Sequence, residues 1–363
     1  MAINANRLKI LIHMRLIRQF IGNDLRRRIE RQIYCVLVWG LFIAVAPAQA
    51  LSELELANGY TERLREFMHH EGEQATFTSK DGVVLHYQRF DNVCNQTAIV
   101  VLPGWSEPYF KYAEVIIDLR RKHYCVYTMD FRGQGLSSRE VENSQVGHVQ
   151  DFSLYVRDFD QFFQQVVASR KHRQTYLLAH SMGGLVAALY SSQRAEQIDG
   201  VILIAPMLGI NTGAWPQWLA YSIASGLDWL GFGDSFVFGH GEWEEAPFTN
   251  NRLTHSAVRY QYGVDLFQQN GNLMVGGVSN RWLKTSMEYG EKAMNLAPQL
   301  KSKFLIFEAQ YDSFVLSEPM QRFCRLAPQC EKVFLPGSKH ELLMETDAIR
   351  DRVFAKIYQF INE

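Results

Sequence analysis

The chain has 363 residues, of which 47% are hydrophobic and 21% charged, a composition typical of a globular protein with a large core. The formal net charge is only −1, but residues 1–50 carry eight Lys or Arg and two acidic residues. The rest of the chain therefore has 29 basic and 36 acidic residues. A body with this excess of negative charge is a poor candidate for nucleic-acid binding.

Residues 1–50 follow the pattern of a secretory signal peptide. Basic residues 26–28 and 31 precede the apolar run 35–46, which leads to Ala48-Gln49-Ala50. A charged region, a short apolar run and an A-x-A site are typical of such a leader, and the run is shorter than the roughly 20 residues of a spanning helix. We expect cleavage after Ala50 and a periplasmic or cell-envelope location. The alternatives are an uncleaved membrane anchor and a buried helix.

The next segment, residues 51–72, is predicted to be an amphipathic helix that ends near His70, because apolar side chains recur at helical spacing. Two stretches of alternating residues follow, 74–78 and 83–90. Lys80-Asp81-Gly82 lies between them, which is typical of a β-hairpin.

Short apolar runs then recur, mostly separated by helical patterns. Such runs are typical of strands that are buried on both faces of a parallel sheet. The runs are 98–102, 125–129, 175–178, 201–204, 304–307 and 332–335. With the hairpin they predict an α/β fold with about eight strands, mostly parallel and flanked by helices, whose core comprises residues 73–206 and 291–363.

Ser181 has the surroundings of a catalytic nucleophile. Apolar residues 176–179 lead into His180-Ser181-Met182-Gly183-Gly184, and an Ala-rich helical pattern follows at once. A nucleophile elbow needs this order of strand, sharp turn and helix. It also needs small residues two positions before and after the serine, here Ala179 and Gly183. The alternative is a loop that merely joins a strand to a helix.

A serine hydroxyl needs a base to take its proton and an acid to orient that base. In folds with this elbow the chain order is serine, acid, histidine. Asp312 and His340 each follow a predicted strand, so both should lie at the carboxyl edge of the sheet, where Ser181 also sits. Ser181, Asp312 and His340 are therefore the predicted catalytic residues. Glu308 is the alternative acid, and the alternative for His340 is an ordinary surface histidine.

Two backbone N–H groups are needed to bind the oxyanion of the tetrahedral intermediate. Met182 supplies one, and Trp105, in the turn 103–107 after the first buried parallel strand, is expected to supply the other. Residues 130–137 follow another strand, and we interpret them as structural residues that shape the wall of the site. They do not form a G-x-G-x-x-G phosphate cradle.

Residues 207–290 lack a convincing core strand but are rich in aromatic residues. A structureless loop of that length is improbable, so we predict a helical cap inserted beside the catalytic edge of the sheet. The alternative is a helical layer that only completes the core. Trp215, Trp218 and Trp243 are the predicted substrate-binding side chains.

Together these motifs resemble the lysophospholipase and monoglyceride lipase branch of the α/β-hydrolases, from about Phe77 to the end of the chain. The matching segments are 103–107, 111–112, 130–135, 179–184, 251–256, 259–260 and 339–341. The cap segment Leu253-Thr254-His255-Ser256 points more narrowly to lysophospholipase-like members. Pro103 departs from the pattern, since monoglyceride lipases usually have His there.

The resemblance implies an α/β-hydrolase fold and a serine hydrolase that cleaves carboxylic esters of single-chain lipids, lysophospholipids or monoacylglycerols. A membrane surface is a further candidate partner. A short-chain or aryl esterase is the alternative enzyme. The alternative that is not an enzyme is a binding protein of the cell envelope, with the same fold but without catalytic activity.

Four cysteines follow residue 50. In the implied fold, Cys94 and Cys125 lie at the amino-terminal edge of two neighbouring strands, about 4.8 Å apart, while Cys324 and Cys330 are close in sequence. A disulfide joins Cα atoms about 4.4–6.8 Å apart, so we predict the pairs Cys94–Cys125 and Cys324–Cys330. The alternative is a cytoplasmic chain with four reduced thiols. Cysteine and histidine spacings typical of metal sites do not occur, and we expect neither a metal nor a cofactor.

Overall fold

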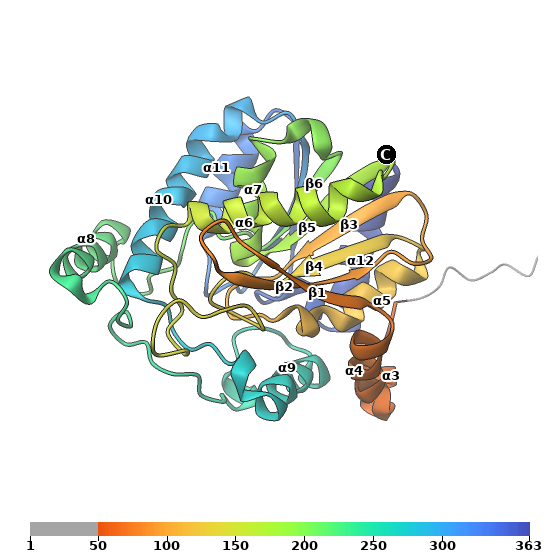
Figure 1. Cartoon of the computed structure of the whole chain (residues 1–363), viewed down its shortest axis with the longest axis horizontal. Helices are drawn as coiled ribbons and strands as arrows, with labels where there is room; N and C mark the ends of the chain where they lie inside the picture. The colour runs from red at the N-terminus through yellow and green to blue at the C-terminus, as the bar shows by residue number, and fades with distance from the viewer. Residues whose placement is uncertain (1–49) are drawn as a thin grey trace, which may run out of the picture. The chain divides into compact units, whose positions relative to one another are not determined.

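A computed structural model of the protein describes residues 50–363 (Figure 1). Except for Ala50, the predicted signal peptide and its alternatives fall outside the described residues. Within residues 50–363, no helix combines the length and the apolar character that crossing a bilayer requires. This part of the chain folds around one central sheet.

Eight strands form the sheet in the order β1-β2-β4-β3-β5-β6-β7-β8. β1 and β2 form an antiparallel hairpin, β2 runs antiparallel to β4, and the remaining pairs are parallel. The predicted α/β fold with a mostly parallel sheet is therefore confirmed. The strands are β1 Glu73–Thr78, β2 Val84–Phe90, β3 Thr97–Leu102, β4 Cys125–Met129, β5 Gln174–His180, β6 Gly200–Ile204, β7 Lys303–Ala309 and β8 Cys330–Leu335.

Helices cover both faces of the sheet (Figure 1). The described α-helices are α3 Glu53–Glu55, α4 Thr61–His70, α5 Ala113–Arg121, α6 Ser153–Phe162, α7 Ser181–Ser191, α8 Gln217–Leu227, α9 Ala257–Gln269, α10 Asn280–Leu296, α11 Ser317–Leu326 and α12 Asp347–Asn362. Residues of α6, α7 and α10 pack on one face, and residues of α5 and α12 pack on the other.

The central strands are apolar throughout because both of their faces are buried. In β3, Val100 lies opposite Tyr127 of β4 and Leu177 of β5, and all three side chains belong to the core under α6 and α7. Their neighbours Ile99 and Val101 belong to the core under α5 and α12. Side chains of a strand alternate between its faces, so both helical layers gain apolar contacts from the same strand.

The amino-terminal helix differs from the prediction. The segment that was expected to be one helix up to His70 is broken between α3 and α4, where Asn58 has a non-helical backbone and Gly59 has φ +91°. Glycine tolerates this left-handed conformation because it lacks a Cβ atom. At the start of the segment, Leu51 is buried and its backbone N–H donates to Oδ1 of Asp118, at 3.0 Å.

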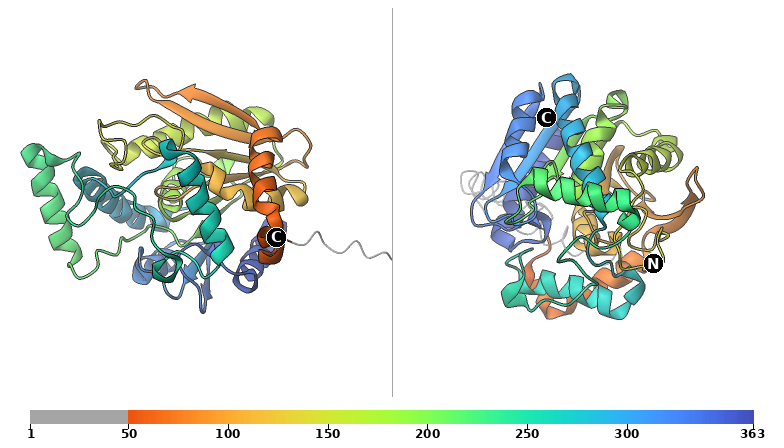
Figure 2. Two further views of the ribbon diagram at one scale, coloured as in Figure 1. Left: turned by 90° about the horizontal axis from the view of Figure 1, so that it is seen from below. Right: turned by 90° about the vertical axis from the view of Figure 1, so that its left-hand side faces the viewer.

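Residues 205–302 connect β6 to β7 through helices and irregular segments, and they include the predicted helical cap, residues 207–290. Helix α8 packs on α10, whereas α9 packs near the segments 56–60 and 109–112. Both views in Figure 2 show α8 well separated from α9. Helix α10 starts inside the predicted cap at Asn280, but it packs on α7 and α11 and completes the helical layer of the core.

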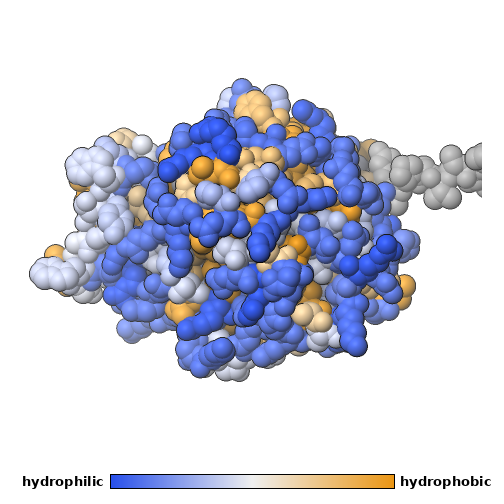
Figure 3. Space-filling model, turned by 90° about the horizontal axis from the view of Figure 1, so that it is seen from above, coloured by the Kyte–Doolittle hydropathy of each residue, from blue (hydrophilic) through white to orange (hydrophobic). Residues whose placement is uncertain are grey.

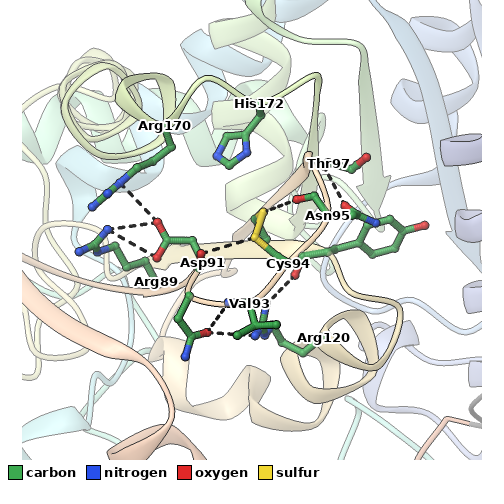
Figure 4. Close-up of a disulfide and its surroundings, with 12 residues drawn as sticks. Arg89, Asp91, Val93, Cys94, Asn95, Thr97, Arg120, Arg170 and His172 are labelled. Carbon is green, nitrogen blue, oxygen red and sulfur yellow. Dashed lines mark hydrogen bonds and ion pairs between the residues drawn. A yellow bond between two sulfur atoms is a disulfide. The ribbon is translucent and has the colours of Figure 1, made fainter.

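Two disulfides lie in the described part of the chain, and they join the predicted pairs. Cys94 bonds to Cys125 with their Cα atoms 5.1 Å apart, and Cys324 bonds to Cys330 with theirs 5.2 Å apart. Figure 4 shows the Cys94–Cys125 bond, which connects the loop after β2 to the first residue of β4. This bond therefore lies at the amino-terminal edge of the parallel strands.

Candidate active site

Ser181 occupies a sharp turn between β5 and α7, as the elbow motif predicts. β5 ends at His180, α7 begins at Ser181, and the φ angle of Ser181 is +48°. A residue with a Cβ atom rarely adopts this left-handed conformation, which costs roughly 1–3 kcal/mol and is often found at functional sites. The fold therefore holds this serine in a strained backbone geometry.

The small residue two positions after the serine is required by packing. A Cβ atom at Gly183 would lie 2.5 Å from the carbonyl oxygen of Pro103 and 2.6 Å from that of Leu102. Both contacts are with backbone atoms that cannot rotate away. Gly183 thus lets α7 approach the end of β3. Ala179, the small residue before the turn, is fully buried in β5.

Asp312 and His340 are brought together by the loops that follow β7 and β8. Nδ1 of His340 lies 2.6 Å from Oδ2 of Asp312. The other carboxylate oxygen accepts the backbone N–H groups of Phe314 and Val315, at 2.8 and 3.0 Å. Burial alone would raise the pKa of Asp312, but its hydrogen bond to His340 and its electrostatic interaction with that imidazole lower the pKa overall. Asp312 is therefore a fixed carboxylate that orients the imidazole.

The alternative acid, Glu308, is engaged elsewhere. It lies within β7, pairs with Lys332 of β8 and accepts a hydrogen bond from the hydroxyl of Ser317. Because both of its oxygens have partners on the strand and on α11, the geometry favours Asp312 as the partner of His340.

His340 also lies beside the elbow. Its ring centroid is 4.8 Å from that of His180, the residue before Ser181, and 5.0 Å from that of Phe314. Ser181 and His340 are both almost fully buried, with 7% and 4% of their surfaces exposed. The three predicted catalytic residues thus come from the turns that follow β5, β7 and β8, at the carboxyl edge of the sheet.

The turn after β3 packs directly against the nucleophile. A Cβ atom at Gly104 would lie 3.2 Å from Cβ of Ser181. The ring of Trp105 is fixed against Trp282 of α10, with ring centroids 4.8 Å apart. Met182 is the second residue of α7, and the first N–H groups of a helix have no acceptor within it. Met182 therefore follows Ser181 directly, and Trp105 follows Gly104, which packs against Ser181. Their role as oxyanion donors stays a prediction.

Gln134 contacts the turn after β3 through its side chain, a contact that the sequence motifs do not reveal. Its side-chain amide donates to the carbonyl oxygen of Gly104 at 2.8 Å, and its side-chain oxygen accepts the backbone N–H of Ser106 at 3.3 Å. Gln134 therefore braces the turn that carries Trp105. The sequence gives one indication of this role: Gln134 lies in the segment 130–137, which is interpreted as the wall of the site.

Asp130 organises that wall from inside the core. It is fully buried and accepts the backbone N–H groups of Tyr109 at 2.7 Å and Leu136 at 2.8 Å. Burial raises the pKa of Asp130 to about 7. A Cβ atom at Gly135 would lie 2.1 Å from this carboxyl group, so the glycine is needed for the turn to close around Asp130.

Four charged or titratable side chains form a second cluster next to the site: Glu107, Lys111, His180 and Glu341. All four are buried. They fall in the matching motifs of the sequence, but no role follows from the motifs alone. Among the described residues, no group of His, Cys, Asp or Glu side chains is arranged to hold a metal ion.

The predicted substrate-binding tryptophans do not form one cluster. Trp215 precedes α8 and Trp218 lies on it, with 51% and 68% of their surfaces exposed. Trp243 instead packs against Phe267 of α9, with ring centroids 5.4 Å apart. Because α8 and α9 are separate, a shared role of the three residues in holding a substrate stays a prediction.

Comparisons with known proteins extend this picture. The family described as "Serine aminopeptidase, S33" (Hydrolase_4) matches residues 94–347. Lysophospholipase L2 of Escherichia coli is 33% identical over 301 residues, which cover 80% of this chain and 87% of the relative. Monoglyceride lipase of Rattus norvegicus is 25% identical over 273 residues, or 73% of this chain and 82% of the relative.

A solved structure shares the fold. A soluble variant of monoglyceride lipase from Saccharomyces cerevisiae, in complex with a substrate analog, aligns with a TM-score of 0.61 and 20% identity. The alignment covers 80% of this chain and 96% of that one. With the elbow at Ser181 and the pair Asp312–His340, these matches show that the chain belongs to the Serine aminopeptidase, S33 family of α/β-hydrolases.

Proposed function

We propose that the protein is a serine hydrolase that cleaves carboxylic esters of single-chain lipids, a lysophospholipid or a monoacylglycerol. The observation that carries the proposal is the pair of His340 and Asp312, 2.6 Å apart, beside a serine held at positive φ. The names of the relatives, lysophospholipase and monoglyceride lipase, support the choice of substrate class.

In the proposed reaction, Oγ of Ser181 attacks the ester carbonyl while Nε2 of His340 takes its proton. Asp312 keeps the other ring nitrogen, Nδ1, protonated, so Nε2 is the nitrogen that is free to accept. The backbone N–H groups of Trp105 and Met182 stabilise the oxyanion. His340 then gives its proton to the leaving alcohol, and a water molecule activated by the same imidazole hydrolyses the acyl-enzyme.

The substrate class is tested by a hydrolysis panel of lysophospholipids, monoacylglycerols, short-chain esters and an aminoacyl anilide. We expect the largest kcat/KM on the single-chain lipids, and Ser181→Ala provides the blank. Preference for short esters would favour a carboxylesterase. Preference for the anilide would favour the peptidase activity that the description of the family names.

We also propose that the α8 region contacts a lipid surface. Trp218, Trp229, Leu230 and Phe232 are 68%, 85%, 61% and 54% exposed, and tryptophan favours the boundary between lipid and water. Figure 3 shows pale and orange residues projecting at the left-hand edge, the side on which α8 lies in Figure 1. Residues 207–250 contain no Lys or Arg, so apolar insertion rather than attraction to anionic lipid supports this contact.

This contact is tested with phosphatidylcholine vesicles. Trp218→Ala combined with Trp229→Ala should reduce co-sedimentation and should lower kcat/KM more for long-chain than for short-chain substrates, since apolar contact scales with buried area. Phe334→Ala is the matched control, because Phe334 is also exposed, at 46%, but lies on β8. Equal vesicle binding by the double variant and the control would refute the role of α8.

Export to the periplasm or cell envelope is the remaining part of the proposal. It is supported by the A-x-A site at Ala50 and by the two disulfides, since disulfides persist mainly in oxidising compartments. Protein from the native host should begin at Leu51 and should show no free thiol after denaturation without reductant. An intact leader would favour the membrane anchor, and four free thiols would refute export.

A further inference from the structure

The carboxylate of Glu107 is the centre of a buried hydrogen-bond network behind the candidate active site. Its Oε2 atom accepts the backbone N–H of Gly104 and the hydroxyl of Tyr112, both at 2.6 Å, and lies 2.8 Å from Nδ1 of His180. Its Oε1 atom accepts Nζ of Lys111 at 2.8 Å. One side chain therefore contacts both the oxyanion turn and the residue before the nucleophile.

The same network reaches the loop of the catalytic histidine. Lys111 also pairs with Glu341, the residue after His340. Nε2 of His180 lies 3.4 Å from the backbone carbonyl oxygen of His340. Three turns that are far apart in sequence, at residues 104, 180 and 340, are thus connected by side chains that are each at most 9% exposed.

The hydrogen-bond partners of His180 favour its protonated form. Nδ1 faces a carboxylate oxygen of Glu107, and Nε2 faces the carbonyl oxygen of His340. Both of these groups accept hydrogen bonds, so an imidazolium, which has a proton on each ring nitrogen, can donate to both of them. The charged and titratable groups around it are Glu107, Lys111, Glu341 and His340.

The charges of the cluster then cancel. Glu107 and Glu341 each contribute a negative charge, and Lys111 and His180 each contribute a positive one. Burial by itself would raise the pKa of Glu107, yet Lys111 and His180 hold it well below its usual range. Burial likewise opposes the charge of His180, yet Glu107 raises the pKa of that imidazole above its ordinary value. Buried charges are tolerated when they are paired and hydrogen-bonded in this way.

We propose that Glu107 is a positioning residue for the reaction: it holds His180 as an imidazolium and fixes Gly104, so that the oxyanion turn, Ser181 and His340 keep their mutual positions. This inference rests on the proposed function of the site. A small displacement of an oxyanion donor or of the base lowers the rate of the chemical step more than it weakens substrate binding.

The first test is Glu107→Gln, a substitution of equal size that removes the charge. We expect kcat to fall about 100-fold, with KM changed less than about threefold because binding of the acyl chain is unaffected. The rate at which a fluorophosphonate labels Ser181 should fall in parallel. A wild-type kcat and labelling rate in folded Glu107→Gln would overturn the proposal.

Asp118→Asn is the matched control. Asp118 is also buried and pairs with Arg350 at 2.7 Å, but it lies on α5 away from the three catalytic turns. The control should lose stability while its folded fraction keeps its kcat within about twofold, because the partners of Asp118 are Leu51, Tyr358 and Arg350 rather than residues of the three turns. If Glu107→Gln does not fold, Tyr112→Phe removes a single hydrogen bond to Glu107 and should still lower kcat several-fold, with the fold retained. An unchanged kcat in that variant would refute the positioning role.

The balance of charge gives a second, independent test. Lys111→Met leaves two carboxylates facing one cation, whereas Lys111→Met combined with Glu341→Gln restores neutrality. The double variant should therefore have a higher kcat than Lys111→Met alone, a coupling that a double-mutant cycle measures. If the second substitution lowers kcat further, the cluster does not act through its charge balance.

The charge of His180 can be observed directly by ¹⁵N NMR of the imidazole rings at pH 8. We expect two nitrogen-bound protons on His180 in the wild type and one in Glu107→Gln, with His180→Gln identifying the signals. A single proton in the wild type would overturn the assignment. Failure of this proposal is distinguishable from failure of the proposed function. If the enzyme is inactive on lipid esters, the wild type and Glu107→Gln can still be compared by the rate at which a fluorophosphonate labels Ser181.

Discussion

Nδ1 of His340 lies 2.6 Å from Oδ2 of Asp312, although the two residues are 28 positions apart in the sequence. Two consecutive parallel strands, β7 and β8, deliver the two side chains to the same edge of the sheet. Asp312 is therefore the carboxylate that orients His340, whereas the nearby carboxylate of Glu308 is paired with Lys332.

Asp312→Asn should therefore lower kcat by about 10⁴-fold, since an amide no longer selects the productive tautomer of His340. Glu308→Gln should change kcat by less than about threefold and should act mainly on stability, because it disrupts an ion pair between two strands. Steady-state kinetics on a monoacylglycerol or a soluble ester compares the two variants. A larger loss in Glu308→Gln than in Asp312→Asn would show that the acid is assigned wrongly.

Gly183→Ala should destabilise the protein by about 1–3 kcal/mol or more, as expected of overpacking. The added Cβ atom would lie 2.5 Å from the carbonyl oxygen of Pro103, so α7 would have to move away from the oxyanion turn. Gly226→Ala in α8 is the control, since its Cβ atom would meet nothing within 4 Å. Chemical denaturation and kcat measure both effects, and equal stability of the two variants would contradict the packing argument.

Loss of the Cys94–Cys125 bond should lower the free energy of unfolding by about 4 kcal/mol in the chain-entropy model, against about 2 kcal/mol for Cys324–Cys330. The Cys94–Cys125 bond joins residues 31 positions apart, whereas the Cys324–Cys330 bond joins residues 6 positions apart, and the longer loop gives the larger effect. Paired Cys→Ala substitutions and urea denaturation test this order. Activity at 25 °C should be retained without the first bond, because it lies at the edge of the sheet opposite the site.

Asp130 predicts a specific pH dependence of stability. Burial raises its pKa to about 7 in the folded protein, from an ordinary value of 3.8. Between these values the folded state binds more protons than the unfolded state, so this group's contribution to stability falls as the pH rises from about 4 to 7. Asp130→Asn removes this titrating carboxyl group. The free energy of unfolding at pH 8 minus that at pH 5 should therefore be larger in Asp130→Asn than in the wild type. The same pH dependence in both proteins would refute the shift.

Local patterns in the sequence were sufficient for the fold class and for the candidate catalytic residues. Apolar runs that are buried on both faces are diagnostic of parallel strands, and residues that follow such strands share one edge of the sheet. Ser181, Asp312 and His340 could therefore be placed together by chain order alone. The pair Cys94–Cys125 could be predicted in the same way, since Cys125 starts a strand and Cys94 lies just before the neighbouring strand. The pair Cys324–Cys330 could be predicted because the two residues are close in sequence.

Contacts between distant segments were decided only by the tertiary structure. The break at Gly59 depends on a backbone conformation that the helical spacing of apolar residues does not reveal. The division of residues 205–302 between α8 and α9 depends on which neighbours each helix meets. The network around Glu107 joins residues up to 230 positions apart, and only the packing of three turns brings its charges together. Periodicity reports which face of an element is buried, whereas partners in a buried polar network are chosen by geometry in three dimensions.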